Sequence, residues 1–187
     1  KMEQFLNLIN NTTKNFSIFK QPIRIISHLD TDGLTAASIL ITALKREHIS
    51  FSLSIVKQLS PAILKELENE SYESYIFTDL GSGNLNEVNQ SLKNKNILIL
   101  DHHHIQDTET NLTHINPRIF NPDSDREISG AGISYLFAKS LNNNNKDLAH
   151  LAIIGAIGDG QEEKGFISFN KQILEDVVSE NKIEVKT

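Results

Sequence analysis

Aspartate and histidine residues stand directly behind apolar runs at four places in this chain. The most concentrated group is Asp101-His102-His103, which follows the apolar run 96–100. Carboxylate oxygens and imidazole nitrogens bind divalent cations, and two cations held side by side can activate water for attack on a phosphoester. The residue types therefore predict a metal-dependent phosphoesterase.

The other three groups share this placement behind an apolar run. They are His28, Asp30 and Asp32 after the run 22–26, Asp79 after the run 75–77, and Asp159 after the run 151–157. A buried strand does not need an acidic residue at its end, and crowded carboxylates without cations would repel one another. If the ends of these runs meet, they form a cage of oxygen and nitrogen ligands that suits two cations.

Each group also has an ordinary structural explanation. Asp32 could cap a helix, Asp79 could form a turn, and Asp159 could end a helix. Gly130 and Gly132 begin a predicted helix, where backbone N–H groups could hold a phosphate or the glycines could permit tight helix packing. Both interpretations of the glycines stay open, whereas the joint pattern of the four groups favours the metal site.

The elements that must position these groups alternate between strand and helix. Continuous apolar runs predict strands over residues 23–27, 51–56, 75–78 and 96–100. Helical spacing predicts helices over residues 2–10, 34–47, 61–69, 84–92, 130–141, 146–157 and 170–179. Such alternation is typical of a parallel sheet with helices on both faces, in which ligands bind at the carboxyl ends of the strands.

We therefore predict the α/β class and a single domain over residues 1–187. A strand–helix core occupies about residues 20–105, a polar loop covers residues 106–121, and a mostly helical part follows over about residues 126–180. The polar tail 181–187 could be the start of a linker.

The composition limits the chemistry and the partners. The chain has no cysteine, which excludes disulfides, zinc thiolate sites and a cysteine nucleophile, and favours manganese or magnesium. Its net charge of −6 is unusual for a protein that grips long nucleic acid, so we expect another domain or partner to supply most of that grip. No apolar run approaches the roughly 20 residues that span a membrane, and residues 1–4 show no apolar signal core, so we expect no secretion. We therefore expect a cytoplasmic protein with no membrane partner.

With these residues in view, the chain resembles the DHH phosphoesterase superfamily, which is named for the Asp-His-His motif seen at residues 101–103. Within it, the chain is most similar to the RecJ-like single-strand exonucleases, especially their archaeal branch. The segment 28–33, His-Leu-Asp-Thr-Asp-Gly, has the tight spacing of that branch, whereas the superfamily's nano-RNases and inorganic pyrophosphatases have a longer gap. The segments 129–135 and 154–161 resemble the branch's helix start and its fourth motif.

The resemblance implies a role for each candidate residue. His28 and Asp30 would hold one Mn²⁺, Asp32, His102 and Asp159 would hold a second, and Asp79 would bridge the two. Mg²⁺ would be a weaker substitute. His103 would contact the scissile phosphate. From its place directly after the strand, and independently of the resemblance, we expect Asp101 to orient a ligand histidine without itself binding the metal.

The implied activity is hydrolysis of single-stranded nucleic acid or short oligonucleotides to 5′-nucleotides, with replication or repair proteins as possible partners. One alternative is a hydrolase of small substrates such as very short RNA, cyclic dinucleotides or 3′-phosphoadenosine 5′-phosphate. A second alternative is a replication scaffold of the Cdc45 type, in which the ligands are eroded. Family members also carry a second domain, DHHA1, that holds the strand, and we expect this chain to lack it.

Overall fold

The computed structural model describes residues 1–180, and the predicted polar tail lies outside them. The strands are β1 (Ile23–His28), β2 (Phe51–Val56), β3 (Ser74–Thr78), β4 (Asn96–Leu100) and β5 (Thr113–Ile115). The α-helices are α1 (Met2–Lys14), α2 (Thr31–Arg46), α3 (Pro61–Glu68), α4 (Leu85–Ser91), α5 (Gly130–Leu141), α6 (Ala149–Gly158) and α7 (Ser168–Ser179). Short 3₁₀ turns are η1 (Phe16–Ile18), η2 (Ser82–Asn84), η3 (Pro117–Ile119) and η4 (Asn143–Leu148). No helix in this described part is long and apolar enough to cross a membrane.

The strands form one parallel sheet in the order β2-β1-β3-β4-β5. All four predicted strands are present, with bounds within one residue of the prediction. Because every strand runs the same way, the carboxyl ends of all of them lie at one edge of the sheet. The predicted α/β class is confirmed.

The fifth strand corrects the prediction of a polar loop over residues 106–121. β5 pairs with β4 through the partners Leu98–Thr113, Ile99–His114 and Leu100–Ile115. Of the three β5 residues only Ile115 is apolar, and it is fully buried. A strand this short and this polar leaves no apolar run to recognise, so its pairing with β4 decides its conformation.

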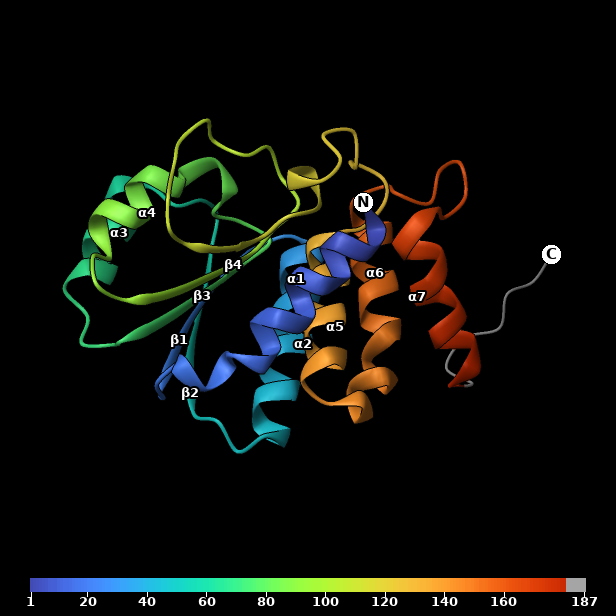
Figure 1. Ribbon diagram of the computed structural model, residues 1–187, viewed down its shortest axis with the longest axis horizontal. Helices are drawn as coiled ribbons and strands as arrows, with labels where there is room; N and C mark the ends of the chain where they lie inside the picture. The colour runs from blue at the N-terminus through green and yellow to red at the C-terminus, as the bar shows by residue number, and fades with distance from the viewer. Residues whose placement is uncertain (181–187) are drawn as a thin grey trace.

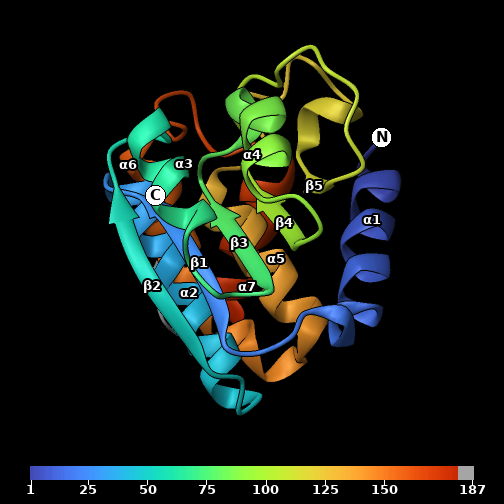
Figure 2. The ribbon, with the colours of Figure 1, turned by 90° about the vertical axis from the view of Figure 1, so that its left-hand side faces the viewer.

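Helices cover both faces of the sheet (Figures 1 and 2). Figure 1 shows α3 and α4 on one side, whereas α1, α2, α5, α6 and α7 lie on the other. Each side has its own apolar core, and the larger one joins α2 with α5 and α6. The helical part that follows the sheet therefore shares a core with the strands and holds the ends of α5 and α6 near the sheet edge.

The start of α2 differs from the prediction in a way that matters for the site. The helix begins at Thr31 rather than Leu34, and Asp30 caps it by accepting a hydrogen bond of 2.9 Å from the Gly33 N–H. Asp32, the cap in the purely structural alternative, lies instead within the first turn and is fully buried. Capping by Asp30 thus frees the Asp32 carboxylate for other partners.

Candidate metal centre

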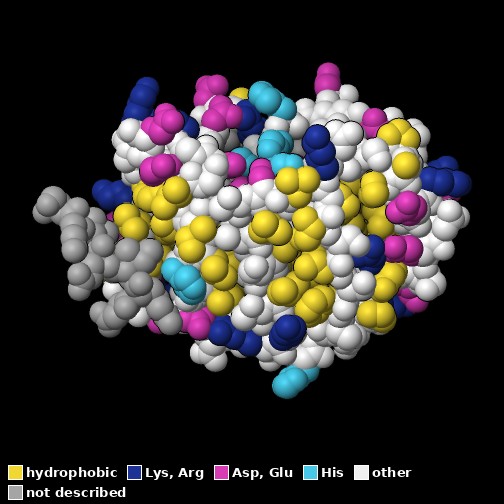
Figure 3. Space-filling model, turned by 180° about the vertical axis from the view of Figure 1, so that it is seen from behind, with side chains coloured by type: hydrophobic (Ala, Val, Ile, Leu, Met, Phe, Trp, Pro, Cys, Tyr) yellow, Lys and Arg dark blue, Asp and Glu magenta, His cyan; other side chains and the backbone are white. Residues whose placement is uncertain are grey.

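The ends of three neighbouring strands bring the predicted ligands together at one edge of the sheet. His28 is the last residue of β1, Asp79 directly follows β3, and His102 lies two residues beyond β4. Asp159 approaches from the opposite side as the residue that ends α6. Figure 3 shows histidine and acidic side chains gathered beside one another at this edge of the molecule.

Asp79 lies at the middle of this arrangement, and its two carboxylate oxygens face different histidines. Oδ2 is 3.4 Å from His28 Nδ1, and Oδ1 is 3.3 Å from His102 Nε2. The side chain is 1% exposed, and the backbone φ is 57°, in the left-handed region that few residues other than glycine adopt. Such a conformation costs about 1–3 kcal/mol, and strained residues of this kind cluster at active sites and ligand-binding sites.

The remaining candidates form one group on each side of Asp79. On the first side, His28 Nδ1 lies 2.8 Å from Asp30 Oδ2. On the second side, His102 Nε2 lies 3.1 Å from Asp159 Oδ2 and 3.5 Å from Asp32 Oδ2. Within the sets His28–Asp30–Asp79, Asp32–His102–Asp159 and Asp79–His102–His103, the possible ligand atoms all lie within 4.8 Å of one another.

The donor set fits divalent cations because its central atoms lack other partners. Among the residues that the structure describes, His28 Nδ1, both oxygens of Asp79 and His102 Nε2 are buried without a hydrogen-bond partner. These atoms face one another at short distances but not in hydrogen-bond geometry. Each unsatisfied polar atom costs about 1–3 kcal/mol, and a cation on each side of Asp79 would satisfy all four.

The protonation of the carboxylates supports the same interpretation. Burial, together with the negative charges of Asp32 and Asp101, raises the pKa of Asp79 far above its usual range. Burial and the charge of Asp32 raise the pKa of Asp159 to about 6. Crowded carboxylates therefore retain protons when no cation is present, and a bound cation would displace those protons.

Asp32 connects this centre to the N-terminus of α5. Its two oxygens accept hydrogen bonds of 2.6 Å from the Gly130 N–H and 2.9 Å from the Ala131 N–H. The helix dipole and these two donors both stabilise a carboxylate at this position. The helix end therefore fixes the direction in which Asp32 faces the centre.

This contact decides between the two interpretations of the glycines at the start of α5. A Cβ on Gly130 would lie 2.6 Å from Asp79 Oδ1, and a Cβ on Gly132 would lie 2.6 Å from Ile128 Cγ1. The Gly130 N–H is bonded to Asp32, and the Gly132 N–H donates to Ser129 Oγ at 3.2 Å. The structure therefore favours tight packing over the alternative of a phosphate contact at Gly130 and Gly132, because both N–H groups already have partners.

A glycine in α6 provides a test of this close packing. A Cβ on Gly155 would lie 2.4 Å from Asp32 Oδ1 and 2.5 Å from the Ala131 Cβ. Gly155→Ala should lower the free energy of unfolding by about 1–3 kcal/mol, a typical cost of overpacking, and should weaken Mn²⁺ binding because Asp32 must move. Thermal unfolding and a metal titration measure both effects. Gly83→Ala is the control, because its nearest neighbour would be 4.0 Å away, and equal effects of the two substitutions would contradict the interpretation.

Asp101 orients the neighbouring histidine rather than facing the centre. It is fully buried, and its Oδ1 accepts from the Nδ1 of His103 at 2.7 Å and from the backbone N–H of His102 at 2.8 Å. Its Oδ2 accepts from the backbone N–H of Ser82 at 2.8 Å. We expected Asp101 to orient a metal-ligand histidine, but the ring it holds is that of His103, the expected phosphate contact.

The Asp101–His103 pair also sets the charge of both groups. The hydrogen bond to Asp101 raises the pKa of His103 despite its partial burial. Burial alone would raise the pKa of Asp101, but the hydrogen bond from His103, the charges of both histidines and the Ser82 N–H together lower it below its usual range. The His103 side chain is 52% exposed, so an imidazole whose charged form is favoured by Asp101 lies accessible at the edge of the centre.

Sequence reasoning gave no role to several residues that support these ligands. Gln161 is buried, and its Nε2 donates to Asp159 Oδ2 at 3.4 Å, whereas its Oε1 accepts from Asn170 Nδ2 at 2.6 Å. Ser82 donates its backbone N–H to Asp101, and Asn116 Nδ2 donates to the carbonyl oxygen of His103. Side-chain amides and hydroxyls of this kind carry no periodic signal, and only the folded chain shows their partners.

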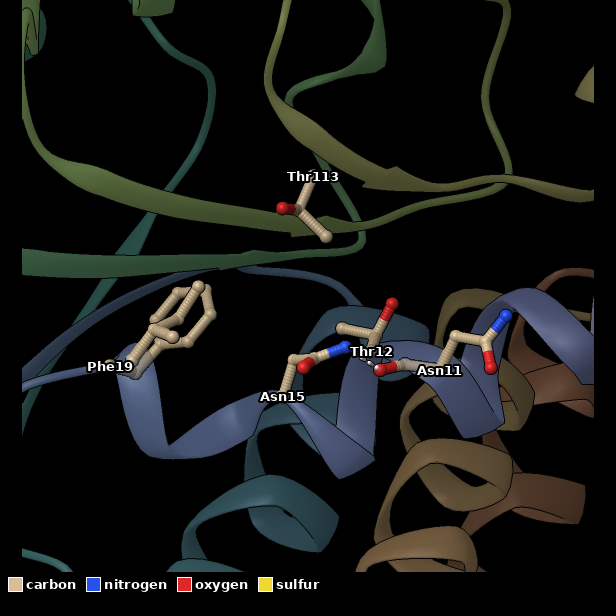
Figure 4. Close-up of a pocket in the computed structure, with 6 residues that line it drawn as sticks. Asn11, Thr12, Asn15, Phe19 and Thr113 are labelled. Atoms are coloured by element: carbon tan, nitrogen blue, oxygen red, sulfur yellow. Dashed lines mark hydrogen bonds between the residues drawn. The ribbon is translucent and has the colours of Figure 1, made fainter.

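A separate pocket lies away from the centre, between α1, η1 and β5 (Figure 4). The residues that line it include Asn11, Thr12, Asn15, Phe19 and Thr113. None of the residues that line it is ionisable, so the pocket offers no charged cation ligands and no acid–base groups. The chemistry of the described part therefore concentrates at the sheet edge.

Comparison with known proteins gives the family. Residues 22–156 match the DHH family, N-terminal domain, and the chain belongs to this family. The uncharacterized protein MJ0831 of Methanocaldococcus jannaschii is 39% identical over 159 residues, which cover 81% of this chain and 36% of that protein. The chain thus spans about a third of the length of the curated relative it matches.

Solved structures share the fold. Exonuclease RecJ bound to manganese has a TM-score of 0.74 and 21% identity, over 91% of this chain and 47% of that one. RecJ of Thermus thermophilus in complex with Mn²⁺ has a TM-score of 0.72 and 20% identity, over 92% and 26% of the two chains. CDC45 from Entamoeba histolytica has a TM-score of 0.63 and 19% identity, over 98% and 38%. The predicted resemblance to the DHH family with a RecJ-like fold is confirmed.

Proposed function

We propose that this chain is the catalytic part of a RecJ-like exonuclease that cuts single-stranded nucleic acid or short oligonucleotides and releases 5′-nucleotides. The observation that carries the proposal is the set of four buried, unpartnered ligand atoms around Asp79. In the proposal His28 and Asp30 hold one Mn²⁺, Asp32, His102 and Asp159 hold the other, and Asp79 bridges them. Bound cations of this kind supply Lewis acidity and a hydroxide nucleophile at neutral pH, and Mg²⁺ would be a weaker substitute.

His103 would act directly on the substrate. Its Nδ1 is engaged by Asp101, and the imidazole is half-exposed, so its Nε2 is left to meet an incoming group. A protonated imidazole donates a hydrogen bond to a non-bridging phosphate oxygen and stabilises the negative charge that develops there. Asp101 supports this role because it fixes the ring and favours its charged form.

A crevice of about 210 Å³ beside the centre offers room for the substrate. Its lining includes the candidate residues His28, Asp79 and His103, together with Lys57 from the loop after β2. Lys57 is the only lysine or arginine among the lining residues, and it could contact a phosphate. One basic residue and a net charge of −6 support weak binding of long strands by this part alone.

Two alternative functions are each supported by a specific observation. The acidic charge and the small crevice are also compatible with a hydrolase of very short RNA, cyclic dinucleotides or 3′-phosphoadenosine 5′-phosphate. The fold shared with CDC45 supports a scaffold role, or a partner among replication or repair proteins. Each of the six candidate ligand positions carries an aspartate or a histidine in this chain, which argues against a scaffold without activity.

A digestion experiment tests the proposal. Single strands of DNA and RNA, labelled at either end and graded from two to about thirty nucleotides, are incubated with the chain and Mn²⁺, and the products are identified. We expect 5′-mononucleotides from single strands of several lengths. Cleavage restricted to dinucleotides, cyclic dinucleotides or 3′-phosphoadenosine 5′-phosphate would establish the first alternative, and no hydrolysis of any substrate would favour the scaffold.

The two adjacent histidines should respond differently to substitution. His102→Ala removes a candidate ligand, so Mn²⁺ should bind more weakly. His103→Ala should keep the metal content and lower turnover by about 10²–10³-fold, the usual effect of losing a hydrogen-bond donor to the transition state. Metal analysis and kcat on a chromogenic phosphodiester separate the two effects. The exposed His104 is the control, because it belongs to none of the ligand sets, and loss of metal from His103→Ala would reverse the assignment.

A further inference from the structure

The segment that follows β5 holds the backbone of the two site histidines. Asn116 is fully buried, and its Nδ2 donates to the carbonyl oxygen of His103 at 2.9 Å. Arg118 is 9% exposed at its side chain, and its Nε donates to the carbonyl oxygen of His102 at 2.9 Å. Neither side chain belongs to a ligand set, and both act on peptide groups rather than on imidazoles.

These contacts complete a set of hydrogen bonds to the backbone of His102 and His103. The N–H groups of His102 and His103 donate to Asp101 Oδ1 at 2.8 and 3.3 Å, and their carbonyls accept from Arg118 and Asn116. Each of the two residues is thus held on its N–H side by one acidic side chain and on its carbonyl side by a separate donor. A backbone fixed in this way leaves the rings little freedom to turn away from the centre.

Further hydrogen bonds fix the side-chain amide of Asn116 in this orientation. Its second Nδ2 hydrogen reaches Ser82 Oγ at 2.8 Å, and its Oδ1 accepts from the Arg118 N–H at 2.9 Å. Ser82 also donates its own N–H to Asp101 and contacts His114 Nε2 at 2.8 Å. The amide thus uses both donor hydrogens and one acceptor position, and it links β5 to the turns after β3 and β4.

Arg118 is fixed in a similar manner. Its Nη1 donates to the Pro122 carbonyl oxygen at 2.7 Å, and its guanidinium forms an ion pair with Asp125. The planar guanidinium therefore reaches His102 in a direction that its other contacts define.

We propose that Asn116 and Arg118 are positioning residues, which fix the peptide groups of His103 and His102 and so aim one imidazole at the substrate and the other at the metal. The inference rests on the proposed function for what the two imidazoles do. It assigns a role to the segment after β5, the part of the chain that the sequence pattern described only as a polar loop.

The first test observes the imidazoles without requiring activity. In the metal-free 187-residue chain labelled with ¹⁵N-histidine, the Nδ1–H of His103 that is bonded to Asp101 should give a downfield proton signal. Asn116→Asp keeps the shape of the side chain but replaces two donated hydrogen bonds by a carboxylate facing two acceptors, so this signal should be lost or shifted. Asn145→Asp is the matched control, because Asn145 is also fully buried and donates to a backbone carbonyl, that of Ala138 at 2.9 Å.

The second test separates the two positioning residues by kinetics. Asn116→Asp should lower kcat on a chromogenic phosphodiester about 10–100-fold with KM unchanged, since it acts through His103. Arg118→Gln should weaken Mn²⁺ binding about 10–100-fold, since it acts through His102. Arg46→Gln is the control for the arginine, because Arg46 likewise pairs with an aspartate and donates to a backbone carbonyl, that of Asn144.

Each outcome decides the proposal. A folded Asn116→Asp protein with an unchanged imidazole signal and unchanged kcat overturns it, as does an equal loss of signal in Asn145→Asp. If Asn116→Asp does not fold, Arg118→Gln decides, because it breaks the His102 contact and leaves the buried amide in place. If the parent chain hydrolyses nothing, the proposed function fails, and the imidazole signals and Mn²⁺ titrations still show whether these residues position the histidines.

Discussion

Asp79→Asn should lower hydrolysis by about 10³-fold or more and, at the same time, make the metal-free protein more resistant to heat. The activity falls because one neutral amide replaces the carboxylate that faces both His28 and His102. Cations contribute several kcal/mol of transition-state stabilisation, and each 1.4 kcal/mol is roughly tenfold in rate. The stability rises because asparagine is also uncharged in the unfolded chain, so folding no longer has to protonate Asp79 or to bury its negative charge beside Asp32 and Asp101.

Asparagine is the substitution of choice because it tolerates the left-handed backbone of this position. Metal content, kcat and thermal unfolding in chelator are measured for Asp79→Asn, for Asp159→Asn and for the exposed control Asp107→Asn. Asp159 belongs to one ligand set only, so its variant should retain more Mn²⁺ than the Asp79 variant. Two cations per chain in Asp79→Asn would falsify the bridging role.

The sequence predicted the strand ends well because parallel strands leave a strong signal. The run 96–100 was located to the residue, since strands buried on both faces are nearly continuous in apolar residues. The run 51–56 was also located to the residue, although this edge strand is only partly buried and contains two serines. Once parallel strands are predicted, topology alone brings His28, Asp79 and His102 to the same edge. The candidate ligands could therefore be named before any distance was known.

Contacts between residues far apart in the chain could not be predicted from the sequence pattern. Asp30 rather than Asp32 caps α2, because the carboxylate of Asp32 is taken by the N-terminus of α5, 98 residues further along the chain. Gly130 was ambiguous for the same reason, since its close neighbour Asp79 lies on another element. The sequence around Asn116 gave no sign of its role, because the role of a single buried amide follows only from its hydrogen-bond partners in the folded chain.

Removal of divalent cations should abolish hydrolysis and should lower thermal stability more strongly at neutral than at acidic pH. A cation that binds only the folded state adds about 2.7 kcal/mol at one hundred times its Kd, which raises the melting temperature of a chain of this size by about 5–10 °C. Protons compete for the same carboxylates, so the stabilisation by Mn²⁺ should shrink as the pH falls.

The direction of the pH effect follows from the raised pKa of the buried carboxyls. Folding raises the pKa of Asp159 from 3.8 to about 6, so the folded metal-free state binds the proton more tightly than the unfolded chain does. That contribution to stability is fully present below pH 3.8 and is lost as the pH rises through about 6. Asp79, whose pKa is raised further, extends the loss toward neutral pH.

Thermal unfolding from pH 4 to pH 8, with excess chelator and with excess Mn²⁺, measures this effect. The gap between the two melting temperatures should widen as the pH rises, and Asp159→Asn should show a smaller gap at pH 7 than the parent. Carboxyls outside the centre contribute to both curves and cancel in the difference. A gap that stays constant across the range, or full hydrolysis in excess chelator, would mean that these carboxylates do not bind the cations on which the proposed chemistry depends.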